Sequence, residues 1–179
     1  MFGYTEKENI VFHINREDIK TKLEPQVRIE TVIFKVSELS SEQYSRLVQF
    51  TGMFHLLYLR LKYGFKETYI LIAYADDEIA HVEWIVPTKK ISKRYRFVTN
   101  NSYAIIGCVT RPEFRGKGVF ASQIQRVACS DIQSEKYWIW AGASNLSSLK
   151  AIRKAGAVEV GKAVRKKWLF GLISKAELR

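Results

Sequence analysis

The sequence has few of the residues that mark disulfide-rich or metal-binding proteins. Its 179 residues include two cysteines and three histidines. We expect Cys108 in a strand and Cys129 in a helix, as buried and reduced thiols rather than a disulfide. His13, His55 and His81 are scattered along the chain, so we expect no metal site.

Long apolar runs are also missing. The longest, 69–74 and 103–109, are far shorter than the roughly 20 residues that cross a bilayer, so we expect no membrane span. The first ten residues lack the basic segment and apolar run of a secretory signal, and we expect a cytoplasmic protein. No repeat or low-complexity linker divides the chain, and we expect residues 1–179 to form a single domain.

Acidic residues are scarce relative to basic ones. The formal charge is +11, which favours anionic partners such as CoA, a nucleotide-linked substrate, nucleic acid or a membrane surface, and a merely solvated basic surface is the alternative. No nucleic-acid-binding motif accompanies the charge, so we do not expect nucleic acid as a partner. The basic residues gather at Lys89, Lys90, Lys93, Arg94 and Arg96 and again at Arg165, Lys166 and Lys167.

What the sequence does contain is a regular succession of apolar patterns. At 47% hydrophobic and 26% charged residues, it is typical of a globular protein. The pattern predicts a mixed α and β fold, in the order strand, two helices, three strands, helix, strand, helix, two strands. The expected strands are 28–36, 68–74, 79–86, 103–110, 137–143, 158–164 and 167–172. The expected helices are two within 42–63, broken at Thr51 and Gly52, one with the apolar face Phe120, Ile124, Val127 and Ile132, and one from Asn145 to Gly156.

The segment 110–121, TRPEFRGKGVFA, places glycines between a predicted strand and a predicted helix. Glycines let a ligand approach the backbone, and the free N–H groups of a first helical turn bind phosphate oxygens. Arg115 and Lys117 add positive charge. The spacing matches neither a nucleotide P-loop nor a dinucleotide fingerprint, so the pyrophosphate of CoA is the better candidate.

This segment resembles the acetyl-CoA-binding motif of the GNAT superfamily of N-acetyltransferases, Arg/Gln-x-x-Gly-x-Gly/Ala. Arg115 and Gly118 match it, whereas Phe120 stands at the final small position and Ala121 follows. The resemblance implies a GNAT-like fold, a central mixed and mainly antiparallel sheet flanked by helices, and acetyl-CoA as acyl donor. The backbone near Cys108, Val109 and Thr110 would pair with the pantetheine arm, and one N–H there would polarise the thioester. The implied loop residues are Arg115, Gly116, Lys117, Gly118, Val119, Phe120 and Ala121.

A second segment, with Asn145, Ser148 and Gly156, resembles the second cofactor-binding segment of the same family. The resemblance implies that Asn145 contacts the pantetheine arm. Asn145 is also a good helix cap, and the two roles are compatible. Many members carry a tyrosine acid seven residues after this asparagine, where this chain has Ile152, so no tyrosine acid is carried over.

Acetyl transfer to an amine also needs a proton acceptor. His81 and Glu83 lie two apart on a predicted strand and therefore face the same side, which would bring an imidazole and a carboxylate together. The alternative is that both lie on the solvent-facing edge of a hairpin. Tyr103, at the start of the predicted cofactor strand, is a third candidate.

These features favour an N-acetyltransferase acting on a primary amine of a small substrate, with an amino sugar, free or nucleotide-linked, as our candidate. One alternative is a longer acyl donor carried by CoA or by an acyl carrier protein, whose acidic surface a basic chain would attract. The other is a non-catalytic module that binds CoA or acts as a basic adaptor. The oligomeric state is open, with a homodimer as the alternative to a monomer.

Overall fold

The computed structural model describes residues 5–63, 66–168 and 173–178. These residues form one β-sheet with helices on both faces. The elements follow in the order β1 (Thr5–Ile14), β2 (Glu30–Lys35), α1 (Ser41–Thr51), α2 (Met53–Tyr63), β3 (Tyr69–Ala75), β4 (Glu78–Pro87), β5 (Tyr103–Thr110), α3 (Val119–Ala128), β6 (Tyr137–Gly142), α4 (Leu146–Lys154), β7 (Val158–Trp168) and β8 (Ile173–Leu178).

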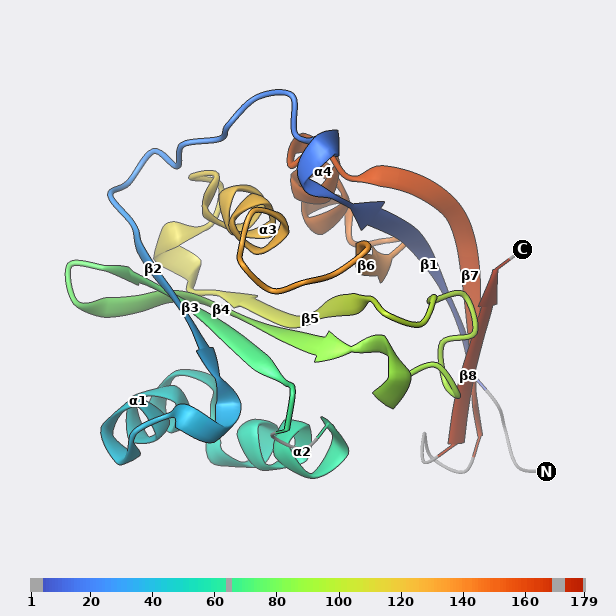
Figure 1. Cartoon of the computed structure of the whole chain (residues 1–179), viewed down its shortest axis with the longest axis horizontal. Helices are drawn as coiled ribbons and strands as arrows, with labels where there is room; N and C mark the ends of the chain where they lie inside the picture. The colour runs from blue at the N-terminus through green and yellow to red at the C-terminus, as the bar shows by residue number, and fades with distance from the viewer. Residues whose placement is uncertain (1–4, 64–65, 169–172, 179) are drawn as a thin grey trace.

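Within these residues the strand order across the sheet is β2-β3-β4-β5-β6-β1-β7-β8. Neighbouring strands are antiparallel except β5 and β6, which are parallel. Helices α1 and α2 cover one face of the sheet, and α3 and α4 cover the other (Figure 1). The predicted fold class, a mixed and mainly antiparallel sheet flanked by helices, is therefore confirmed.

The core is split by the sheet into two apolar layers, because successive side chains of a strand point to opposite faces. On β3, Ile70 and Ile72 belong to the layer under α1 and α2, whereas Leu71 and Ala73 belong to the layer under α3 and α4. All four are fully buried. The continuous apolar run at 69–74 therefore reflects a strand covered on both faces.

Most predicted elements are present. Gly52 separates α1 from α2, β3 and β4 form the expected hairpin, and β5 has the predicted bounds. Helix α3 ends at Ala128, so Ile132 lies beyond the helix to which the pattern assigned it.

The strand β1 was not predicted. Its apolar run at 10–14 is preceded by polar residues, which hide the alternation typical of a strand. The structure explains the polar half, because Glu6 and Glu8 lie within 3.6 Å and 3.1 Å of Lys166 and Lys162 on β7. The apolar half, with Phe12 and Ile14 fully buried, packs beneath α3 and α4.

The prediction for the last two strands was wrong in its bounds. β7 continues through the basic residues Arg165, Lys166 and Lys167 to Trp168, because β1 pairs alongside it from Thr5 to His13. Of the strand predicted at 167–172, residues 169–172 lie outside the described residues. The final strand observed is β8, which pairs with β7.

The two thiols also differ from expectation. Cys108 lies in a strand, β5, as predicted, but it is half-buried rather than buried, and Cys129 follows α3 and is exposed. The end of the amphipathic helix leaves Cys129 outside the apolar layer. Within the described ranges, the helices are too short or too polar for any of them to traverse a lipid bilayer.

Candidate functional site

The parallel strands β5 and β6 separate almost as soon as they begin. They pair only at Tyr103 with Tyr137 and at Ala104 with Trp138, although β5 continues to Thr110 and β6 to Gly142. On its other side β5 stays paired with β4 up to Thr110. One edge of β5 is therefore left facing a fork between the strands, where an extended ligand can add as a further strand.

A β-bulge lies on the β5 arm of the fork. The register between β4 and β5 shifts between Val82 and Trp84, opposite Gly107, which has a φ of +61°. A Cβ at Gly107 would lie 3.3 Å from Cδ1 of Trp84 and 3.6 Å from Cδ1 of Leu59. The bulge turns Cys108 to the face of α3 and α4, and Ile106 to the face of α1 and α2.

The predicted glycine loop connects the open end of β5 to α3. Gly118 is the N-cap of α3 with a φ of +81°, a left-handed conformation that suits glycine. The N–H groups from Gly116 to Ala121 have no backbone acceptor among the described residues. These amides lie at the positive end of the α3 dipole, which makes this turn suited to an anion. The structure thus joins all the loop residues implied by the motif in one turn.

Two charged side chains flank this turn. Arg115 is exposed, and its Nε donates to the carbonyl oxygen of Thr110 at 3.0 Å. The Nζ of Lys117 lies 5.7 Å from the ring centre of Phe114. Both cations therefore belong to the loop that carries the free amides, with Arg115 turned to Thr110 and Lys117 to Phe114.

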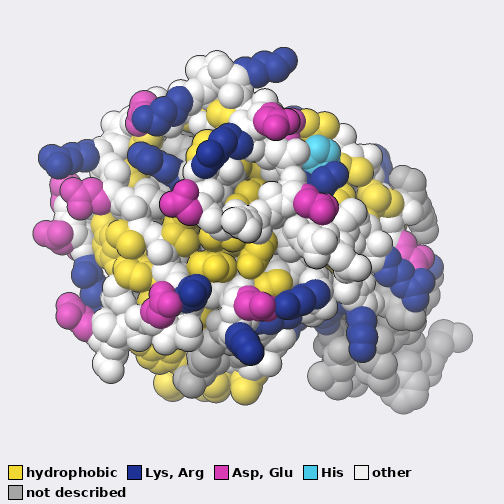
Figure 2. All heavy atoms as spheres, in the orientation of Figure 1, with side chains coloured by type: hydrophobic (Ala, Val, Ile, Leu, Met, Phe, Trp, Pro, Cys, Tyr) yellow, Lys and Arg dark blue, Asp and Glu magenta, His cyan; other side chains and the backbone are white. Residues whose placement is uncertain are grey.

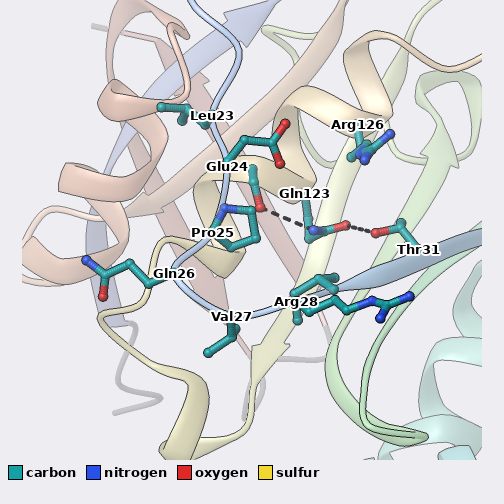
Figure 3. Close-up of a pocket in the computed structure, with 11 residues that line it drawn as sticks. Leu23, Glu24, Pro25, Gln26, Val27, Arg28, Thr31, Gln123 and Arg126 are labelled. Carbon is teal, nitrogen blue, oxygen red and sulfur yellow. Dashed lines mark hydrogen bonds between the residues drawn. The ribbon is translucent and has the colours of Figure 1, made fainter.

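A segment missed by the sequence analysis lies against the back of the loop. Gln26 N–H donates to the carbonyl of Lys117 at 2.9 Å, and Leu23 N–H donates to the side chain of Gln125 at 2.8 Å. Between this segment and α3 is a groove of about 230 Å³ that reaches Thr31, whose hydroxyl donates to Gln123 at 2.8 Å (Figure 3). The groove borders β2, at the far edge of the sheet from β6, so it is separate from the fork.

His81 and Glu83 lie together on β4, as their spacing predicted. His81 Nε2 is 3.2 Å from Oε2 of Glu83, and His81 Nδ1 is 2.7 Å from the hydroxyl oxygen of Thr110. Both residues are fully buried, so the alternative of a solvent-facing edge is wrong. Phe120 packs against His81, with its ring centre 5.5 Å from that of the imidazole.

The hydrogen bonds that join His81 to Glu83 and to Thr110 have a defined direction. A Glu83 carboxylate accepts from Nε2–H of His81, which leaves Nδ1 to accept from the Thr110 hydroxyl. The second oxygen of Glu83, Oε1, is buried without a partner among the described residues. Burial and the Glu83 carboxylate both raise the pKa of the nearby Cys108 thiol. Sequence reasoning missed the Thr110 side chain, since the motif pointed only to its backbone.

The remaining candidates lie at two other points of the fork. Tyr103 is at its closed end, five residues or about 16 Å of strand from Cys108, and packs against Tyr69. Burial raises the pKa of its phenol. Asn145 follows β6, on the opposite arm, and its side chain caps α4 by accepting from Ser148 N–H at 3.2 Å. The predicted cap is confirmed.

Comparison with known proteins identifies this architecture. No family model and no curated protein sequence matches the chain. Three solved structures cover 90–93% of it: a conserved protein of unknown function from Staphylococcus epidermidis, at 15% identity and a TM-score of 0.62, a GCN5-related N-acetyltransferase from Sphaerobacter thermophilus, at 17% and 0.60, and a GNAT-family acetyltransferase from Colwellia psychrerythraea, at 12% and 0.59. The chain spans 61%, 53% and 56% of their respective lengths. These likenesses show that the chain has the GNAT fold.

Proposed function

We propose that the chain is an N-acetyltransferase that moves an acetyl group from acetyl-CoA to a primary amine of a small substrate. The observation that supports this most directly is the combination of an open β5 edge with a row of free amides at the start of α3. One extended ligand with a peptide-like arm and a pyrophosphate would satisfy both features.

The donor would be held mainly by backbone groups. The amides from Gly116 to Ala121 would bind the pyrophosphate, with Arg115 and Lys117 adding charge. The edge at Cys108, Val109 and Thr110 would pair with the pantetheine arm, and Asn145 and Ser148 would approach it from the β6 side. When bound, acetyl-CoA supplies a thioester that an amine attacks and a thiol whose pKa of about 8.5 makes it a good leaving group without a tyrosine acid at Ile152.

The proton of the attacking amine would leave through the Thr110 hydroxyl. A protonated primary amine has a pKa near about 10, so it must lose a proton before it can attack. His81 is fully buried and does not reach a substrate directly, but Thr110 is half-buried at the open end of the fork. Thr110 would accept the proton while passing its own to Nδ1 of His81, and the Glu83 carboxylate would stabilise the resulting imidazolium. We assign this step to His81 and Glu83 rather than to Tyr103, which lies at the closed end.

The first experiment measures donor binding. We expect acetyl-CoA to raise the melting temperature of the native chain, AMP to raise it much less, and Gly118→Trp to abolish the effect. A bulky residue is strained at a φ of +81°, and its Cβ would lie 3.7 Å from Cα of Pro25, so it would distort the anion-binding turn from behind. Gly52→Trp is the matched control, because Gly52 has nearly the same positive φ, +83°, and no atom within 4 Å of its added Cβ. Failure of saturating acetyl-CoA to stabilise the native chain would refute the proposal and favour a basic adaptor.

The second experiment measures turnover. Release of free CoA thiol is followed with amino sugars, nucleotide-linked amino sugars, polyamines and peptides as acceptors. Acetyl-CoA competes with longer acyl-CoA thioesters to define the donor. Product from amino sugars supports both the acetyl transfer and the amino sugar as acceptor. Product only from peptides or polyamines excludes the amino sugar as acceptor. Tight acetyl-CoA binding without thiol release across the panel would identify a non-catalytic CoA-binding module.

A further inference from the structure

Beneath the fork, on the face of α1 and α2, basic and aromatic side chains from three separate segments converge. Leu59 of α2 lies against the bulge at Gly107. Lys62 and Tyr63 follow Leu59 by three and four residues and therefore lie on the same side of the helix. Tyr63 is buried, and Lys62 Nζ lies 4.9 Å from its ring centre. This part of α2 thus continues from the bulge along the underside of the sheet.

The second contribution comes from the segment between β4 and β5. Tyr95 is buried with its ring centre 4.4 Å from that of Trp140, a β6 residue on the other arm of the fork. Arg94 precedes it, and its carbonyl accepts from Ala176 N–H at 2.7 Å. Ala176 is the register partner of Arg165 on β7. The backbones of Arg94 and Arg165 therefore both lie next to Ala176 on β8.

The charges of Arg94 and Arg165 both act on Lys62. Burial lowers the pKa of Lys62, and the charges of Arg94 and Arg165 lower it further, against the effect of a hydrogen bond to Tyr58 at 2.7 Å. Burial of the Tyr58 phenol is outweighed by Lys62 and Arg94, which lower its pKa. Like charges held together and partly out of water favour an anion between them.

No carboxylate in the described part of the chain forms an ion pair with any of these three side chains. Their neighbours differ in this respect, since Arg96 lies 2.9 Å from Glu177 and Lys166 lies 3.6 Å from Glu6. Nε of Arg165 is buried and has no hydrogen-bond partner among the described residues. The cluster therefore has an unused donor and no acidic partner among the described residues.

We infer that Lys62, Arg94 and Arg165 bind a phosphate or carboxylate group of the acceptor substrate, whose amine reaches the fork. This inference rests on the proposed acyl transfer, and it narrows the acceptor to amines that carry an anionic group. In Figure 1 the segment before β5 lies between α2 and the strands β7 and β8, the three parts of the chain that carry these cations. Figure 2 shows Lys and Arg side chains spread over this view of the molecule. Tyr63 and Tyr95 are buried in the apolar layer of this face, and the half-buried Trp140, which packs against Tyr95, would contact the body of the acceptor.

The test compares three amino sugars that differ in their anion: glucosamine with none, glucosamine 6-phosphate with a phosphate, and muramic acid with a carboxylate. Their affinities are measured by calorimetry on the full chain, alone and saturated with CoA. We expect at least one anionic sugar to bind about tenfold more tightly than glucosamine, and Lys62→Gln and Arg165→Gln each to reduce that preference about tenfold. Lys150→Gln, on the exposed side of α4, is the matched control and should change nothing.

Acetyl-CoA affinity, measured on the same variants, separates the two proposals. If acetyl-CoA binds but the three sugars bind equally weakly, or the preference survives both substitutions, the anion site is refuted and the acyltransferase proposal stands. If acetyl-CoA does not bind but the anion preference is present and depends on Lys62 and Arg165, the anion site stands and the acyltransferase proposal fails.

Discussion

The two sides of the fork are constructed differently. Most of the donor side is one continuous stretch, from Tyr103 to Ala121, which presents backbone amides and a strand edge, and Asn145 and Ser148 add to it from the β6 arm. The proposed acceptor side draws one cation each from α2, the segment before β5 and β7, and it presents side chains. A backbone site tolerates changes of side chain, whereas a side-chain site changes with each substitution. We therefore expect the donor to be the fixed part of this protein and the acceptor the adaptable part.

The largest effect is expected from a change at Trp84, whose side chain lies between the donor side and the proposed acceptor side of the fork. Trp84 is almost fully buried, contacts the bulge at Gly107 and packs in the layer under α2. We expect Trp84→Ala to lower the free energy of unfolding by about 3–5 kcal/mol, as for other large-to-small core changes. Urea unfolding measures it, and Trp84→Phe should lose less. A loss below about 1 kcal/mol would mean that the bulge does not depend on this contact.

A smaller test acts on the donor side alone. We expect Thr110→Val to lower kcat about a hundredfold, because it removes the hydroxyl that links the amine to His81, while acetyl-CoA affinity stays unchanged. Thiol-release kinetics measure both. Thr110→Ser should recover most of the activity, and Thr31→Val, which removes a hydroxyl bonded to Gln123 away from the fork, should leave it intact. An unchanged kcat in Thr110→Val would exclude the relay.

The two thiols sharpen the comparison further. Cys129 is exposed, whereas burial and Glu83 raise the pKa of Cys108 on the fork. Because the thiolate is the reactive form, we expect Cys129 to react with a disulfide reagent at least about tenfold faster than Cys108 at pH 8. Acetyl-CoA should slow the reaction of Cys108 only. Mass spectrometry of the labelled peptides measures both rates, and equal rates would contradict the raised pKa of Cys108.

The smallest effect is expected far from both sides. Glu8 and Lys162 join β1 to β7 through a pair at 3.1 Å in which both side chains are about half exposed. We expect Lys162→Gln to cost about 0.2–1 kcal/mol of unfolding free energy and to leave both ligand affinities unchanged. Urea unfolding and calorimetry measure these. A change in either affinity would show that the β1–β7 junction communicates with the fork.

The same contrast explains what the sequence could predict. The strand at 103–110, the glycine loop and the start of α3 are encoded by adjacent residues, and the structure confirms their order. The spacing of His81 and Glu83 predicted their contact, but His81 also packs against Phe120 and bonds to Thr110, which are distant in sequence. Lys62, Arg94 and Arg165 carry no local pattern, since only the folded sheet brings them together. β1 was not predicted, because its polar half forms ion pairs with β7 that the sequence does not indicate.

The position of β1 has a consequence for how the chain reaches this structure. Asn9 pairs with Gly142 on one side and with Ala163 on the other, so the first strand of the sheet needs two of its last three strands, β6 and β7, as neighbours. Contacts so distant along the chain close slowly. During synthesis, β2 to β5 can pair as they emerge, whereas the apolar residues of β1 stay exposed until β6 and β7 have been made. β1 is therefore made first but enters the sheet late. We expect chaperones that assist folding of this chain to bind residues 10–14.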